Sequence, residues 1–226
     1  MLLLALDTTT ASGSVALLEN ARLLAEINAV SASSHSARLL RSVDELLRLN
    51  SVSIKDVEGL AVAAGPGSFT GIRIGLSTAK ALALASGRPV ASVSTLEALA
   101  FKLRDSQARL VCPILDAKKG EVFAALFEFQ AGRLEEAIPQ AAYKPDRFFS
   151  ALPGHRVISF IGNGAEVFQE KIFAYLKDKA RFPSRSTFIA HEVGLLGYKI
   201  LKDGRGKSGD DLQPLYFRRS QAEEKR

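Results

Sequence analysis

Cysteine, histidine and tryptophan are scarce in this sequence of 226 residues, which has one cysteine, three histidines and no tryptophan. A single cysteine, Cys112, excludes a disulfide framework and any zinc or iron–sulfur site built from several cysteines. No histidine is followed by a second one three or four residues later, and Leu195 stands where a zinc-protease motif starting at His191 needs its second histidine. Metal chemistry therefore has little support in the sequence.

Long apolar runs are missing as well. No segment approaches the roughly 18 continuous apolar residues that a membrane helix needs. The first residues, MLLLALDTTT, are interrupted by Asp7 and have no basic leader, so we expect no signal peptide. The expected location is the cytoplasm, with which a single cysteine is compatible.

The composition is that of a globular chain. Apolar residues make up 47% and charged residues 24% of the sequence, which is typical of one large domain or two small ones. The net charge of +6 is compatible with a polyanionic partner such as nucleic acid. Basic residues gather late in the chain, where they form either a solvated surface or a contact for a phosphate backbone. They are Arg181, Arg185, Lys199, Lys202, Arg205, Lys207, Arg218 and Arg219.

The sequence contains an internal repeat. Residues 3–19, LLALDTTTASGSVALLE, and residues 112–128, CPILDAKKGEVFAALFE, both run from an apolar segment ending in Leu-Asp, through a polar turn with glycine, to a second apolar segment. Asp7 corresponds to Asp116 in this alignment. Each copy has the pattern of a β-hairpin. Unless the two patterns coincide by chance, hairpins half a chain apart predict a duplicated, two-lobed α/β molecule.

The rest of the chain fits two α/β lobes, 1–105 and 106–226, with the C-terminal helix and tail able to pack back on the first lobe. Hydrophobic periodicity and turn residues predict the other elements. We expect strands at 22–29, 59–64, 90–94 and 157–162, helices at 34–50, 72–86, 95–103, 166–177 and 190–201, and a strand or ordered tail at 212–220.

The two hairpin turns are the first candidate site. Asp7, Thr8 and Thr9 end the first strand and Asp116 ends the equivalent strand of the repeat. A turn rich in threonine and glycine offers backbone N–H groups and hydroxyls to an anion, and the aspartate could hold a metal ion or water beside a phosphate. The alternative is two ordinary strand turns in which aspartate is the local turn former.

The glycine-rich segment GPGSFTGIRIG, residues 65–75, is the second candidate. It lacks the Gly-Lys-Ser/Thr of a phosphate-binding loop and the glycine spacing of a dinucleotide site. Gly71, Gly75, Ala79 and Ala83 recur every four residues and leave a strip of small residues along one helix face. This strip allows close packing, either within the chain or against a helix of another subunit.

Long segments of the sequence resemble the bacterial TsaB (YeaZ) family. They are LALDTTTASGSVAL, HSARLL, GPGSFTGIRIGLSTAKALA, SVSTLEALA and LDAKKGEVFAALFE, with FIGNGAEVF and QPLYFRRS as weaker matches. The resemblance implies the actin-like ATPase (ASKHA) fold, with duplicated ribonuclease-H-like lobes whose mixed sheets are flanked by helices. This agrees with the internal repeat.

The resemblance also implies that the chain is not an enzyme on its own. TsaD, the related catalytic subunit, has a metal-binding His-x-x-x-His segment, and Thr95 and Leu99 take those two positions here. Neither side chain can replace an imidazole ligand. Asn163 lies between the glycines that approach adenosine in actin-like kinases. We therefore expect no metal, no catalytic residue and no tightly bound cofactor in this chain, while the complex uses ATP.

The implied role is that of a scaffold. The chain would form a heterodimer with TsaD and recruit the ATPase TsaE, in a complex that transfers a threonylcarbamoyl group from an adenylate made by TsaC to adenosine 37 of tRNAs reading codons that begin with A. Helices of the first lobe would make the interface, and the chain alone could be a monomer or a homodimer. The candidate interface residues are Leu39, Val43, Leu46, Gly71, Gly75 and Ala79.

The alternative is an enzyme of the same superfamily. In an ATP-dependent phosphotransferase or carbamoyltransferase, Asp7, Thr8, Thr9 and Asp116 would hold phosphate and magnesium. A peptidase is a third possibility, for which the sequence supplies no ligand set.

Overall fold

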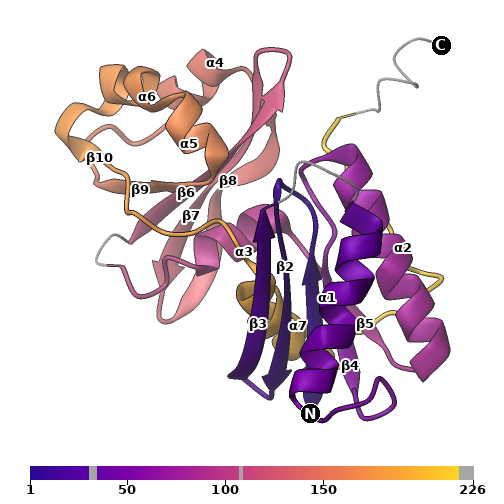
Figure 1. Cartoon of the computed structure of the whole chain (residues 1–226). Helices are drawn as coiled ribbons and strands as arrows, with labels where there is room; N and C mark the ends of the chain where they lie inside the picture. The colour runs from indigo at the N-terminus through magenta and orange to yellow at the C-terminus, as the bar shows by residue number, and fades with distance from the viewer. Residues whose placement is uncertain (31–34, 107–108, 219–226) are drawn as a thin grey trace. The chain divides into compact units, whose positions relative to one another are not determined.

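The computed structural model describes residues 1–30, 35–106 and 109–218, which form two compact units (Figure 1). Unit 1 contains Met1–Ala98 and Phe188–Tyr216, and unit 2 contains Leu99–Thr187 together with Phe217 and Arg218. The boundary differs from the expected halves 1–105 and 106–226, but the last helix and the segment after it belong to unit 1, as expected for a C-terminal helix and tail that pack back on the first lobe. Within the described ranges, every helix is too short or too polar to span a membrane.

Unit 1 is built on a mixed five-stranded sheet in the order β3-β2-β1-β4-β5. Its strands are β1 (Leu2–Asp7), β2 (Ser12–Glu19), β3 (Arg22–Val30), β4 (Gly59–Ala63) and β5 (Val90–Val93). The first three form an antiparallel meander, and β4 and β5 extend the sheet in parallel from β1. The carboxyl ends of β1, β4 and β5 therefore lie at one edge, where ligands bind in many α/β sheets.

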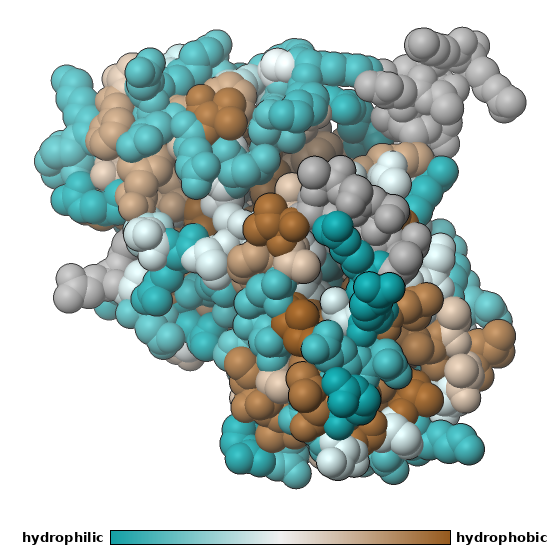
Figure 2. All heavy atoms as spheres, in the orientation of Figure 1, coloured by the Kyte–Doolittle hydropathy of each residue, from teal (hydrophilic) through white to brown (hydrophobic). Residues whose placement is uncertain are grey.

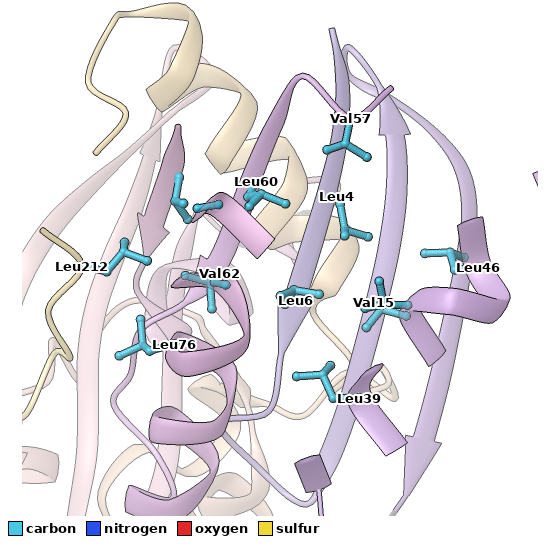
Figure 3. Close-up of a cluster of buried hydrophobic side chains, with 14 of the residues drawn as sticks. Leu4, Leu6, Val15, Leu39, Leu46, Val57, Leu60, Val62, Leu76 and Leu212 are labelled. Carbon is cyan, nitrogen blue, oxygen red and sulfur yellow. The ribbon is translucent and has the colours of Figure 1, made fainter. Parts of the chain in front are cut away.

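Helices cover both faces of this sheet (Figure 1). On one face lie α1 (His35–Leu49) and α2 (Phe69–Ser86), and on the other lies α7 (Ala190–Lys202). Alternation along β1 and β2 sends one set of apolar side chains towards α1 and α2, where they form the buried cluster of Figure 3. Glycines let α7 approach the other face, because a Cβ at Gly197 would lie only 2.4 Å from that of Ala61.

Unit 2 repeats this plan with a mixed sheet in the order β10-β9-β6-β7-β8. Its strands are β6 (Leu110–Lys118), β7 (Glu121–Gln130), β8 (Arg133–Tyr143), β9 (Ile158–Ile161) and β10 (Ala180–Arg181). The helices of this part of the chain are α3 (Thr95–Phe101), which spans the boundary between the units, α4 (Pro145–Ser150), α5 (Asn163–Val167) and α6 (Gln169–Leu176), followed by the short 3-10 helix η1 (Lys177–Lys179). Both sheets thus begin with an antiparallel meander and add parallel strands, which confirms the duplication.

Several elements differ from the sequence prediction. Helix α2 begins at Phe69, inside the expected loop, because the Ser68 hydroxyl caps it by accepting a hydrogen bond from the Gly71 amide, 3.3 Å away. The expected helix 166–177 is two helices that meet at Phe168. Strand β8 and helix α4 lie between residues 128 and 157, where the sequence analysis predicted no element. The segment 212–220 was expected as a strand or an ordered tail, and its described part fits the second alternative, because it pairs with no other strand and is anchored by the buried Leu212.

Candidate functional site

The first hairpin turn holds a buried carboxyl group. Asp7 ends β1 and is fully buried. Its Oδ1 accepts hydrogen bonds from the Thr9 amide, 2.9 Å away, and the Thr9 hydroxyl, 2.7 Å away. Its Oδ2 is buried with no hydrogen-bond partner among the described residues. Burial raises the pKa of Asp7 from 3.8 to about 6, against the opposing effect of the two hydrogen bonds from Thr9.

The start of α2 lies directly against this turn. The Thr8 hydroxyl donates to the Gly71 carbonyl, 2.7 Å away, and the Ser68 amide donates to the Thr9 carbonyl, 2.7 Å away. A Cβ at Gly71 would lie 1.9 Å from the Thr8 carbonyl oxygen, and one at Gly75 would lie 2.6 Å from Thr8 Oγ1. The small-residue strip therefore serves packing within the chain. The polar groups of Thr8 and Thr9 are used by neighbouring backbone and by Asp7, which leaves them poorly placed to bind a phosphate.

The space beside Asp7 is small. A cavity of about 30 Å³ is lined by residues of β1, β2, β3 and α1, among them Asp7, Ser14 and Arg38. That volume holds about one water molecule. Small-molecule sites occupy roughly 300–1,000 Å³. The turn of unit 1 can therefore take a water molecule or a small ion, but it has no room of its own for a nucleotide.

The second hairpin turn neutralises its aspartate with a neighbouring lysine. The Lys118 ammonium lies 2.6 Å from Asp116 Oδ2, and the Lys118 amide donates to Asp116 Oδ1, 2.8 Å away. Although partial burial opposes the effect, these hydrogen bonds hold the pKa of Asp116 below its ordinary value. Lys118 and Lys119 adopt positive φ angles of 59° and 54° to make this turn. The two equivalent aspartates are thus in opposite environments.

The other positions that the sequence analysis singled out, Thr95, Leu99 and Asn163, lie in packed or hydrogen-bonded surroundings. Thr95 and Leu99 are buried on α3, and Thr95 Oγ1 has no hydrogen-bond partner among the described residues. The Asn163 side chain accepts a hydrogen bond from the Asp116 amide, 3.2 Å away. A Cβ at Gly162 would lie 2.3 Å from the Ile114 carbonyl oxygen, so this glycine serves the packing of α5 on β6. In the described part of the chain, no group of three or more histidine, cysteine or acidic residues could hold a metal ion.

The structure places the six candidate interface residues in the core of unit 1. Leu39, Val43, Leu46, Gly71, Gly75 and Ala79 are all buried within the chain. Their periodicity marks the inner faces of α1 and α2, so their side chains cannot contact a partner while unit 1 is folded. This corrects the expectation that they form the interface.

The outer faces of α1 and α2 offer a different surface. Leu40 on α1 is 52% exposed, Leu49 on α1 is 64% exposed and Leu84 on α2 is 86% exposed. Hydrophobic residues gather among charged ones over these two helices (Figure 2). We call the exposed side chains of the two helices the α1–α2 surface. Isolated exposed leucines are common on proteins, but three on two neighbouring helices are a candidate for protein contact.

The C-terminal segment packs on the glycine-rich loop, which agrees with the expectation that the tail can pack back on the first lobe, although its contact with this loop was not predicted. The Leu215 amide donates to the Ala64 carbonyl, 2.8 Å away. The Tyr216 ring stacks on Phe69 with centroids 5.0 Å apart, and its hydroxyl accepts from Arg73 Nε at 3.3 Å. Arg73 also lies over the Phe69 ring, 3.9 Å from its centroid. The aromatic residues in GPGSFTG and QPLYF were the available signal.

Comparison with known proteins agrees with this architecture. The family model "TsaD: tRNA N6-adenosine threonylcarbamoyltransferase" matches residues 25–209. The chain is 31% identical to the tRNA threonylcarbamoyladenosine biosynthesis protein TsaB of Bacillus subtilis (strain 168), over 100% of this chain and 97% of that protein. The solved structure of YeaZ from Pseudomonas aeruginosa is 32% identical, with a TM-score of 0.83 over 95% of this chain and 99% of that one.

A more distant structure shows the fold alone. The ROK hexokinase from Thermus thermophilus is 13% identical, with a TM-score of 0.51 over 90% of this chain and 100% of that one. The likeness fits the duplicated mixed sheets of the actin-like ATPase (ASKHA) fold. The near full-length match to a TsaB protein is more specific than either the fold or the TsaD model. On this evidence the chain belongs to the TsaB (YeaZ) family.

Proposed function

We propose that, within the tRNA threonylcarbamoyladenosine biosynthesis in which its family acts, this chain is a non-catalytic subunit that pairs with the catalytic subunit TsaD and helps to recruit the ATPase TsaE. The non-catalytic role is supported by the geometry of the first hairpin turn. Its threonines are engaged within the chain, and its cavity of about 30 Å³ is far too small for a nucleotide. A subunit with such a turn contributes to the reaction through contacts with other proteins.

The α1–α2 surface supports the pairing. It presents Leu40, Leu49 and Leu84 to solvent, while the residues beneath it form a well-packed core that holds the two helices in place. The match of the TsaD model to residues 25–209 indicates that TsaD and this chain share the fold. Two chains of one fold can pair through equivalent helices and form a pseudo-symmetric dimer.

A substitution on this surface tests the pairing. We expect Leu84→Glu to weaken the affinity for TsaD by at least about tenfold, which size exclusion would show as reduced co-elution. The substitution removes an apolar side chain whose burial in the interface is worth roughly 1.5–3 kcal/mol, and it adds a charge. In a reconstitution with TsaC, TsaD, TsaE, labelled threonine, bicarbonate, ATP and unmodified tRNA, label in tRNA should fall accordingly.

The matched control is Val167→Glu, at a side chain of unit 2 that is 61% exposed. This variant should co-elute with TsaD and support labelling like the unmodified chain. Thermal unfolding of both variants should show that the fold is intact. If Leu84→Glu binds TsaD and supports labelling as well as Val167→Glu does, the α1–α2 surface is not the interface.

One observation favours the alternative of an enzyme that uses its own aspartates. Asp7 has a buried carboxylate oxygen without a hydrogen-bond partner among the described residues, a feature found at catalytic and ion-binding sites. The double variant Asp7→Asn, Asp116→Asn separates the two functions in the same reconstitution. A scaffold keeps its labelling activity, whereas an enzyme loses it while TsaD binding is retained.

A further inference from the structure

A pocket of about 660 Å³ lies in unit 2, far from the hairpin turn of that unit. Three arginines line it, and each comes from the start of a parallel strand. Arg109 immediately precedes β6, Arg156 lies two residues before β9, and Arg181 lies in the short β10. The pairing aligns Leu110 with Ile158, and Ile158 with Ala180, so the three strand starts are level with one another. We call this the arginine pocket.

The arginine pocket carries an excess of positive charge. Arg156 forms an ion pair with Glu128, 2.5 Å away, and this hydrogen bond holds the pKa of Glu128 below its ordinary value, with a smaller electrostatic effect from Arg109. Arg181 donates to the backbone carbonyls of Asp178 and Ala180, which fix the guanidinium without cancelling its charge. The Asp178 carboxylate also lies near Arg181, and it pairs with Lys179, 2.9 Å away. The three arginines and Lys179 outnumber the carboxylates of Glu128 and Asp178, which leaves a net charge of about +2.

The rest of the lining is both polar and apolar. Ser106 and the buried Ser159 supply hydroxyl groups, and Leu110 and the 40% exposed Val157 supply an apolar wall. The volume lies within the roughly 300–1,000 Å³ typical of small-molecule sites. Cations and hydroxyls beside apolar side chains match a ligand with an anionic group and a less polar body, such as a nucleotide.

We propose that the arginine pocket binds the phosphate group of a nucleotide, either free in solution or as one unit of an RNA chain. The planar guanidinium group of arginine donates two parallel hydrogen bonds to phosphate oxygens, which makes it the preferred residue for this ligand. In this site, Arg109 and Arg181 bind the phosphate, and Glu128 holds Arg156 in place. The pocket lies about 20 Å along β6 from Asp116, so it is separate from the hairpin turn.

Binding to the isolated full-length chain tests this proposal. The probes are ATP, followed by calorimetry, and a fluorescein-labelled single-stranded RNA and an unmodified tRNA transcript, both followed by anisotropy at low and moderate salt. The variant is Arg109→Gln with Arg181→Gln, which leaves the Arg156–Glu128 pair intact. The control is Arg133→Gln with Arg147→Gln, which removes the same charge from two exposed positions of unit 2.

We expect the pocket variant to weaken binding of at least one probe by tenfold or more, and the control to weaken it by less than about twofold. For RNA, the slope of binding affinity against salt should decrease by about 1 for each phosphate that the variant no longer binds. Weaker binding of ATP alone identifies a free nucleotide as the ligand, and weaker binding of RNA identifies the polymer; both support the site.

Two results would overturn the proposal. An equal decrease in affinity in both variants means that binding reflects general charge and not the pocket. No binding of any probe to the unmodified chain means that no such site exists. Because neither TsaD nor TsaE is present, these results are independent of the pairing tested with Leu84→Glu.

Discussion

At the scale of single residues, the two equivalent aspartates show how one sequence pattern can give two chemical environments. Asp7 is fully buried with one oxygen unpartnered among the described residues, and Asp116 is partly exposed and paired with Lys118. The Leu-Asp pattern predicted both positions at the ends of strands. It could not predict their environments, because these depend on what packs against each turn: α2 against the first, and a lysine from the turn itself against the second.

The raised pKa of Asp7 makes a prediction about stability. The folded state binds this proton more tightly than the unfolded state, so the contribution of Asp7 to stability is lost as pH rises from about 4 to above 6. A shift of about two pKa units corresponds to about 3 kcal/mol. Asp7→Asn keeps an acceptor for Thr9 and cannot ionise. The free energy of unfolding of Asp7→Asn minus that of the unmodified chain should therefore rise by up to about 3 kcal/mol between pH 4 and pH 7.5.

Urea unfolding at several pH values measures this difference. Any fixed cost of placing an amide beside the cavity cancels, because only the change with pH is compared. Asp116→Asn is the control with the opposite sign: Asp116 stabilises the fold when ionised, so the unmodified chain loses that contribution as pH falls. Parallel pH curves for Asp7→Asn and the unmodified chain would contradict the prediction, because they would show that the pKa of Asp7 is not raised in the folded chain.

At the scale of elements, the contact between α2 and the first hairpin turn gives GPGSFTGIRIG a structural role. Gly71 and Gly75 let the helix backbone reach Thr8, and the C-terminal segment covers the loop through Leu215 and Tyr216. The sequence left two uses of the strip open, packing and subunit contact. Periodicity alone cannot separate them, because both require small residues on one helix face.

The packing role predicts that Gly75 cannot be enlarged. Its Cβ would lie 2.6 Å from Thr8 Oγ1, so Gly75→Leu should destabilise the chain by about 3 kcal/mol or more or prevent folding. Ala81→Leu, on the exposed face of the same helix, should change the free energy of unfolding by less than about 0.5 kcal/mol. Urea unfolding of the two variants measures both. A folded, stable Gly75→Leu chain that fails only to bind TsaD would restore the strip as the interface.

How well each helix or strand could be predicted depends on how much of it is buried. Buried strands such as β1 and β4 and amphipathic helices such as α1 and α7 have strong periodicity, and the sequence predicted them. Strand β8 is an edge strand in which every residue is at least partly exposed, so it lacks that signal. The break between α5 and α6 falls at Phe168, which packs against the hydrophobic core of unit 2. Local sequence propensity does not contain information about such a tertiary contact.

At the scale of the whole molecule, the repeat predicted the duplicated fold, and the return of the chain to the first unit was expected only as a possibility for the C-terminal helix and tail. Unit 1 takes its last helix from Phe188–Tyr216, after the chain has completed most of unit 2. The reason lies in the second face of the first sheet: Leu3, Ala5 and Leu18 need a cover that residues 1–98 do not supply, and α7 provides it. The expectation that the C-terminal helix and tail can pack back on the first lobe is confirmed, although the boundary at residue 105, drawn from sequence order, does not include them.

Self-association of the chain is also a property of the whole molecule. Because TsaD and this chain share the fold, the surface proposed for TsaD should also pair two copies of this chain when TsaD is absent, in the isologous arrangement typical of symmetric dimers. We expect sedimentation velocity to show a concentration-dependent dimer. Leu84→Glu should weaken it by tenfold or more, because each dimer then carries the substitution on both sides of the interface.

Val167→Glu is again the matched control, since it adds the same charge to an exposed apolar position of unit 2. It should leave the dimerisation constant within about twofold. Addition of TsaD to the unmodified chain should dissociate the homodimer, because one surface cannot bind two partners at once. A dimer that persists in Leu84→Glu, or that binds TsaD without dissociating, would place self-association on another face and leave the α1–α2 surface to TsaD alone.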